Sequence, residues 1–191
     1  MHIKYFGDSY DVVKQSLIRW LTPFGEWSVH PMFTETTKPA DAAAFATFLG
    51  ARLLSDAVLT VNTNRPSYFG CTSTCGNLLL DPDTGLRLES LGGARAAKYL
   101  FAHELIRLIK ERPGFLTAVF DQSQPRGSPD ESLNRKLDHL SENKVAAFAY
   151  RSHACFIVAA QDPTLARRAY THLLGASQLP NRRFILSRDL G

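Results

Sequence analysis

The segment at residues 115–123 constrains the fold more than any other part of the chain. It reads Phe-Leu-Thr-Ala-Val-Phe-Asp-Gln-Ser, an apolar run with aromatic and β-branched residues that ends on the carboxylate of Asp121. A short run without polar alternation is typical of a strand that helices cover on both faces of a sheet. Open α/β sheets bind ligands beyond the carboxyl ends of such strands. The segment therefore predicts an α/β fold with a site close to Asp121.

Helical and strand-like patterns alternate along most of the chain. Apolar spacings of three and four predict helices at residues 10–21, 42–49, 94–111, 129–142 and 163–175. Short apolar runs predict strands at residues 2–7, 27–34, 57–61, 115–121, 145–150, 154–160 and 183–187, with a hairpin at 77–88. We expect a single α/β domain over residues 1–191. It would be a three-layer sandwich with a mixed, mostly buried, Rossmann-like sheet, about five flanking helices and a loop-and-hairpin excursion at about 62–90.

The composition is that of an ordinary globular protein, since 45% of the 191 residues are hydrophobic and 21% are charged. No run approaches the roughly 18 apolar residues of a membrane span, and the first residues lack the apolar stretch of a signal peptide. We therefore expect a cytoplasmic protein. Three cysteines argue against a disulfide framework. Cys71 and Cys75 have a metal-like spacing without a second pair, so we interpret them as loop thiols.

The whole chain has a net charge of +4, and its positive charge is concentrated in the second half. Residues 1–90 contain 7 Lys and Arg against 9 Asp and Glu, whereas residues 91–191 contain 15 against 9. The densest pairs are Arg167-Arg168 and Arg182-Arg183. Such a basic half can attract nucleic acid or another phosphate-bearing ligand. It can equally be a dispersed, solvated surface that keeps the protein in solution.

Two aspartates lead the candidates for a functional site. Asp8 follows the first predicted strand, with Asp11 close by, and Asp121 ends a later strand. If these strands are neighbours, Asp8 and Asp121 meet at one sheet edge and could hold a divalent cation, Mg²⁺ or Mn²⁺. The metal would activate water for phosphodiester cleavage. The alternative is that Asp8 caps a helix and Asp121 caps a loop.

This arrangement resembles that of the PIN- and NYN-type metal nucleases. Those families also begin with a strand that ends in an acid, continue with a helix, and place further acids on later strand ends. The resemblance covers residues 5–13 and 119–126 and concerns architecture. The dense acidic cluster that it implies downstream is not visible in this sequence.

Other polar residues flank the two aspartates. We expect Ser9, Gln122 and Ser123 to contribute to binding together with Asp11. Arg126 could grip a phosphate or carboxylate with two hydrogen bonds, or belong to an Arg-Gly turn. His153 lies in a turn between two apolar strands, which makes it the preferred acid or base among six histidines. The predicted catalytic set is thus Asp8, Asp121, Arg126 and His153.

Two functions follow from these residues. The first is a divalent-metal-dependent phosphoesterase, similar to a nuclease, with Asp8 and Asp121 as metal ligands. The second is a non-catalytic module in which the same loops bind a nucleotide or a protein. The sequence does not decide between an enzyme and a binding module.

Overall fold

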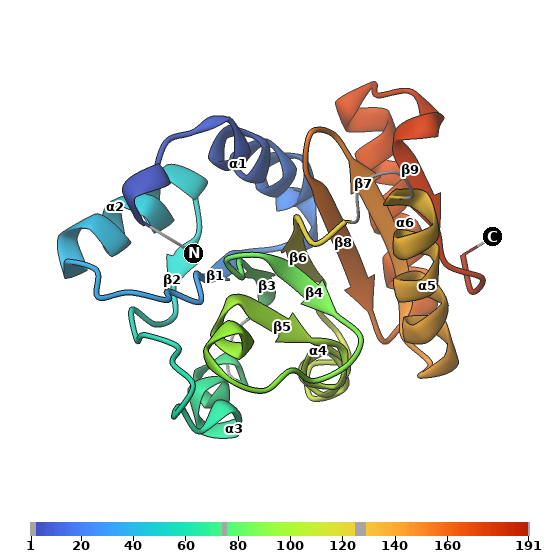
Figure 1. Ribbon diagram of the computed structural model, residues 1–191. Helices are drawn as coiled ribbons and strands as arrows, with labels where there is room; N and C mark the ends of the chain where they lie inside the picture. Colours follow the sequence, from blue (N-terminus) through green and yellow to red (C-terminus); the bar gives the residue numbers. More distant parts are fainter. Residues whose placement is uncertain (1–2, 74–75, 125–128, 191) are drawn as a thin grey trace.

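The core of the protein is a seven-stranded mixed sheet (Figure 1). The computed structural model describes residues 3–73, 76–124 and 129–190. Across the sheet the strands are β2 (Arg52–Leu53), β1 (Trp27–His30), β3 (Asn77–Leu80), β6 (Thr117–Asp121), β8 (Cys155–Ala160), β7 (Ala146–Arg151) and β9 (Phe184–Leu186). The first four are parallel, β8 is antiparallel to both β6 and β7, and β9 is antiparallel to β7. The predicted mixed sheet is confirmed.

Helices cover both faces of this sheet. One face packs against α1 (Ser9–Leu21), α2 (Pro39–Leu49) and α6 (Pro163–Ser177). The other packs against α3 (Arg65–Tyr68), α4 (Ala102–Lys110), α5 (Pro129–Glu142) and a small parallel sheet of β4 (Gly85–Arg87) and β5 (Tyr99–Phe101). In Figure 1, α1 lies above the main sheet, whereas β4, β5 and α4 lie below it. The three-layer arrangement is therefore confirmed.

The strands are mostly apolar because each face of the sheet has its own core. Along β7, Phe148 and Tyr150 belong to the core under α1, α2 and α6. The alternate residues, Ala147 and Ala149, belong to the core under α4 and α5. Successive side chains of a strand point to opposite faces, so a strand buried on both sides is apolar at most of its positions.

Three helix ends follow the local chemistry of the sequence. Asp8 caps α1, since its Oδ1 accepts hydrogen bonds from the backbone N–H groups of Tyr10 at 2.9 Å and Asp11 at 3.1 Å. Gly50 ends α2 in the left-handed region, with φ at 72°. Asp162 caps α6 through the N–H of Thr164. Short 3-10 segments lie at Ile3–Tyr5, Thr22–Phe24, Gly70–Thr72, Ala94–Lys98 and Asn181–Arg183.

The predicted first strand is wrong. Residues Ile3–Tyr5 form a 3-10 turn instead of a strand. Ile3 and Phe6 are three positions apart, so a single turn directs both toward the core that α1 and α2 cover. Asp8 is consequently a helix cap that follows a turn, and it does not end a strand. The strand predicted at 57–61 is also reduced to one bridge, between Phe33 and Val58.

Two further predictions fail between residues 77 and 111. The expected hairpin does not form, because β3 joins the centre of the main sheet while β4 pairs in parallel with β5. The expected helix at 94–111 is divided into a 3-10 turn, β5 and α4. The Glu104 carboxylate accepts a hydrogen bond from the N–H of Phe101 at 2.9 Å, and this contact marks where α4 begins.

The chain changes direction across the sheet between β1 and β3. From β1 it passes through α2 to β2 on one side, whereas from β3 it passes through α4 to β6 on the other. Helices α2 and α4 pack on opposite faces. A crevice forms at the carboxyl ends of strands where successive connections diverge in this way, and ligands of open α/β sheets bind there. Among the described residues, no helix combines the length and the apolar character needed to cross a membrane.

Candidate functional site

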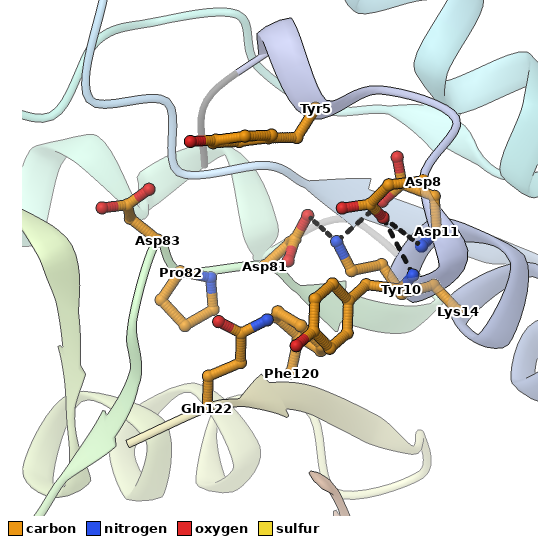
Figure 2. A pocket seen from close by; sticks show the side chains of 10 residues that line it. All are labelled: Tyr5, Asp8, Tyr10, Asp11, Lys14, Asp81, Pro82, Asp83, Phe120 and Gln122. Atoms are coloured by element: carbon orange, nitrogen blue, oxygen red, sulfur yellow. Dashed lines mark hydrogen bonds and ion pairs between the residues drawn. The ribbon is translucent and has the colours of Figure 1, made fainter. Parts of the chain in front are cut away.

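A cleft of about 300 Å³ lies at the carboxyl ends of β3 and β6, beside the point where the connections diverge. Figure 2 shows its lining, in which Tyr5 stands across the opening from Pro82 and Gln122. The residues that line it are Tyr5, Asp8, Tyr10, Asp11, Lys14, Asp81, Pro82, Asp83, Phe120 and Gln122. A volume of this size is at the lower end of the range for small-molecule sites.

A buried lysine holds the floor of the cleft together. Lys14 on α1 donates hydrogen bonds to Asp11 Oδ1 at 2.9 Å and to Asp81 Oδ2 at 2.8 Å. Burial alone would lower the pKa of Lys14, but the two carboxylates outweigh this effect and raise it. The ammonium group is therefore charged. Asp11 is fixed further by the N–H of Gly7, which donates to its Oδ2 at 2.9 Å.

Aromatic rings form the apolar part of the lining. The Lys14 ammonium lies 4.3 Å from the ring centre of Phe120. Tyr10 meets Phe120 edge to face, with 5.6 Å between ring centres. Tyr5 is 58% exposed at the mouth of the cleft. The site thus offers ring faces beside carboxylates, which is the usual mixture of apolar walls and a few polar groups in a ligand pocket.

The cleft carries an excess of negative charge. Four aspartates line it against one lysine. Burial raises the pKa of Asp81, and the charge of Lys14 opposes that rise. Outside the lining, Lys98 approaches Asp83 at 3.6 Å. With one ammonium group against four carboxylates, the lining keeps a net negative charge, and it repels a further negative charge. The cleft is consequently suited to donors and cations and unsuited to phosphate.

Asp121 is engaged elsewhere. Its Oδ2 accepts hydrogen bonds from Lys136 of α5 at 2.6 Å and from Gln124 at 2.7 Å. Its Oδ1 accepts from the N–H of Leu86 at 3.1 Å and from the hydroxyl of Ser123 at 2.6 Å. The carboxylate is fully buried in this set of contacts. It joins β4 and α5 to the end of β6.

A second cavity, of about 640 Å³, adjoins the cleft and shares Tyr10 and Gln122 with it. His153 lies in its lining, in the turn between β7 and β8, and its ring stacks on Tyr10 with 4.6 Å between centres. The Nε2 atom of His153 is 3.3 Å from the hydroxyl of Ser9. The structure therefore brings Ser9 and His153 together, although they are 144 positions apart in the chain.

The predicted site residues divide into three groups. Asp8, Asp11 and Gln122 line the cleft, and Ser9 and His153 meet beside it. Asp121 and Ser123 belong to the buried contacts around Lys136. Arg126 and Cys75 lie outside the described residues.

The metal assignment to Asp8 and Asp121 stays a prediction. Asp8 uses Oδ1 to cap α1, and Asp121 is paired with Lys136. Within residues 3–73, 76–124 and 129–190, no group of three or more His, Cys, Asp or Glu residues is placed to hold a metal ion.

Sequence reasoning missed Lys14, Asp81 and Asp83. Asp81 could have been found, because it directly follows the apolar triplet Leu78–Leu80, much as Asp121 directly follows the apolar run before it. Residues 81–83 read Asp-Pro-Asp, which is also typical of a tight turn, and the hairpin interpretation of 77–88 therefore hides the strand-end signal of Asp81. Lys14 gave no signal, since a lysine on an amphipathic helix is ordinarily exposed.

Comparisons with known protein families, curated proteins and solved structures find no match.

Proposed function

We propose that the acidic cleft at the carboxyl ends of β3 and β6 binds a nucleoside that is neutral or positively charged. The observation that carries this proposal is the lining of several aspartates beside aromatic rings. Carboxylates accept hydrogen bonds from ribose hydroxyls, and the crevice of an open α/β sheet is where nucleotides bind. Tyr5 and Tyr10 supply faces against which a base can stack.

The charge of the cleft selects among nucleosides. A phosphate group next to Asp8, Asp11 and Asp83 would meet repulsion from each of them. A positive charge on the ligand would be attracted by the same groups. Lys14 offsets only part of this preference, because Asp11 and Asp81 share its single positive charge. Adenosine and S-adenosylmethionine are suitable probes, since they share a nucleoside and differ in charge.

The experiment measures thermal shift and calorimetric affinity for both probes. A ligand at a hundred times its Kd adds about 2.7 kcal/mol to the free energy of unfolding, so binding is readily detected. The double variant Asp8→Asn/Asp83→Asn keeps a residue that caps α1 well and removes two charges. We expect it to weaken binding of S-adenosylmethionine about tenfold, or about 1.4 kcal/mol, and binding of adenosine less.

The exposed Asp56→Asn serves as the control, because Asp56 lies outside the cleft and its substitution removes the same kind of charge, one where the double variant removes two. Equal effects of the control and the double variant would count against the proposal. Absence of binding by both probes would remove it.

The divalent-metal phosphoesterase predicted from sequence is the competing function. It requires Asp121 to exchange the ammonium group of Lys136, at 2.6 Å, for a cation. A titration with Mg²⁺ or Mn²⁺ tests this requirement directly. A thermal shift that Asp121→Asn abolishes would favour the phosphoesterase, whereas the nucleoside proposal expects no such shift.

A nucleic-acid partner is a second proposal, supported by a groove of about 550 Å³ between α6 and the Thr22–Phe24 turn. Arg167, Arg168 and His172 line this groove without a carboxylate. The guanidinium of Arg168 lies 5.9 Å from the ring centre of Phe24. Positive charge beside an aromatic face is the combination that single-stranded nucleic acid binds.

A further inference from the structure

The second cavity, which adjoins the acidic cleft, differs from it in charge. Its polar lining includes Gln122, Gln124, Arg151, Ser152, His153 and Arg183. These residues converge because β7 ends, β8 begins and β9 begins at the same edge of the sheet at which β6 ends. The antiparallel order of β8 therefore places a basic cavity directly beside an acidic one.

The one carboxylate in the lining of this cavity is already neutralised. Asp121 is fully buried and pairs with Lys136 at 2.6 Å. Arg183 is exposed and makes no ion pair within the part of the chain that the structure describes. Arg151 pairs with Asp130 through Nη1 and donates to the carbonyl of Arg182 through Nη2 at 3.1 Å. The charge of Arg183 is thus available to a ligand.

Two buried polar atoms at the cavity are unsatisfied. Within the described residues, the Nε atom of Arg151 has no hydrogen-bond acceptor, and the Oε1 atom of Gln124 has no donor. Buried polar atoms are nearly always hydrogen-bonded, so such atoms point to a ligand or to ordered water. A free N–H on an arginine is a strong donor to a phosphate oxygen.

We propose that this cavity binds the phosphate group of a second ligand, with Arg183 and the Nε of Arg151 as the donors. The ligand is either a mononucleotide or the backbone of a single-stranded nucleic acid, since both present the same phosphate chemistry. The two cavities share Tyr10 and Gln122. The protein would then hold a phosphate-bearing ligand next to the nucleoside of the acidic cleft. Only this arrangement of two ligands rests on the proposed function; phosphate binding in the second cavity does not.

The test measures binding of inorganic phosphate, AMP and a ten-residue oligothymidylate by calorimetry. Arg183→Gln removes the charge of an exposed side chain, so the fold should tolerate it. Arg182→Gln is the matched control, because Arg182 is the exposed neighbour and contributes only its backbone carbonyl to the contacts of Arg151. We expect Arg183→Gln to weaken phosphate binding at least tenfold and Arg182→Gln to leave it within twofold.

The outcomes separate the sources and the two proposals. Equal loss in both arginine variants, or no binding of any phosphate probe, would overturn the assignment of this cavity. AMP binding as tightly as the oligonucleotide identifies a mononucleotide. Much tighter, salt-sensitive binding of the oligonucleotide that Arg183→Gln weakens identifies a nucleic-acid backbone in this cavity, since binding in the α6 groove would not depend on Arg183. Asp8→Asn/Asp83→Asn reports on the acidic cleft, so failure of nucleoside binding is seen independently of phosphate binding.

Discussion

At the scale of single residues, the buried charges explain why the cleft has a defined shape. Lys14 lies between two carboxylates that come from different elements, Asp11 on α1 and Asp81 after β3. Such an arrangement fixes the position of α1 relative to the sheet. Burying charges costs solvation energy, which the paired geometry largely offsets. Losing Lys14 leaves both carboxylates buried without its compensating charge.

Lys14→Met should therefore lower the free energy of unfolding by about 3–5 kcal/mol, because it leaves Asp11 and Asp81 uncompensated. Urea unfolding measures the loss. Arg188→Met is the control, since Arg188 pairs with Asp138 at 3.0 Å on the surface, where such a pair contributes below about 1 kcal/mol. Similar losses in both variants would show that the Lys14 contacts carry little stability.

His30 gives the protein a pH dependence that can be isolated. It ends β1, is fully buried, and has a pKa lowered by desolvation from 6.5 to about 4. The unfolded chain takes up a proton below about pH 6.5, whereas folded His30 stays neutral down to about pH 4. The unfolded state binds more protons in this window, so acidification lowers stability, by up to about 3 kcal/mol from this residue.

We expect His30→Gln to remove this part of the pH dependence. The measurement is the free energy of unfolding at several pH values between 7 and about 4, compared with wild type. His103→Gln changes an exposed histidine on α4 and should keep the wild-type slope. An unchanged slope in His30→Gln would mean that His30 takes up its proton over the same pH range in the folded protein as in the unfolded chain.

At the scale of elements, the small sheet of β4 and β5 is anchored through one glycine. Gly85 begins β4 with φ at 138°, and a Cβ atom there would lie 2.1 Å from Asp121 Oδ1 and 3.0 Å from its Cα. The close approach lets the N–H of Leu86 reach the Asp121 carboxylate at 3.1 Å. Only glycine fits this contact, because it lacks a side chain and tolerates positive φ.

Gly85→Ala should lower the free energy of unfolding by more than the change in backbone preference alone accounts for. Gly50→Ala is the control, since Gly50 also has positive φ, at 72°, but open space at its Cβ position. We expect Gly50→Ala to lower the free energy of unfolding by about 1–2 kcal/mol. Gly85→Ala should lower it by about 1–3 kcal/mol more, because of the clash. Chemical denaturation compares the two. Equal losses would show that Asp121 moves freely out of the way.

Elements were predictable where the signal is local. The strands around Val119, Phe148 and Ile157 are mostly apolar, so burial on both faces follows from the sequence alone. The pairing of β4 with β5 is different, because each strand has three residues and its partner lies more than ten positions away. Residues 94–111 carry a helical period throughout, and a tertiary pairing overrides it at Tyr99–Phe101.

The position of the cleft at the carboxyl edge of the sheet was predictable, and the contacts within it were not. Asp8, Asp11 and Gln122 were expected at the carboxyl edge of the sheet, and they line the cleft. The pairing of Lys14 with Asp81 spans 67 positions, and such contacts depend on the strand order. A sequence pattern specifies which strands are buried and leaves their order open.

At the scale of the whole molecule, the basic second half predicts a salt-dependent contact with nucleic acid. Filter binding of a single-stranded oligonucleotide should weaken about tenfold between 50 and 200 mM salt for two phosphate contacts. Arg167→Ala/Arg168→Ala should abolish most of that dependence, because both residues line the α6 groove. Arg52→Ala removes an exposed charge from β2 and should have no effect. Equal effects of these variants would mean that the excess of basic residues keeps the protein in solution and does not bind nucleic acid.

Because β8 runs antiparallel to β6 and β7, the connections to β8 and to β7 lie at opposite edges of the sheet. The turn at 152–154 lies at the edge of the sheet that carries both cavities. The junction between α5 and β7, at Asn143 and Lys144, lies at the opposite edge. The six residues of β8 separate these edges by about 20 Å. A fluorescent reporter spliced into that junction would sit well away from either ligand. The protein could thus be converted into a sensor without rebuilding the surfaces that it would report on.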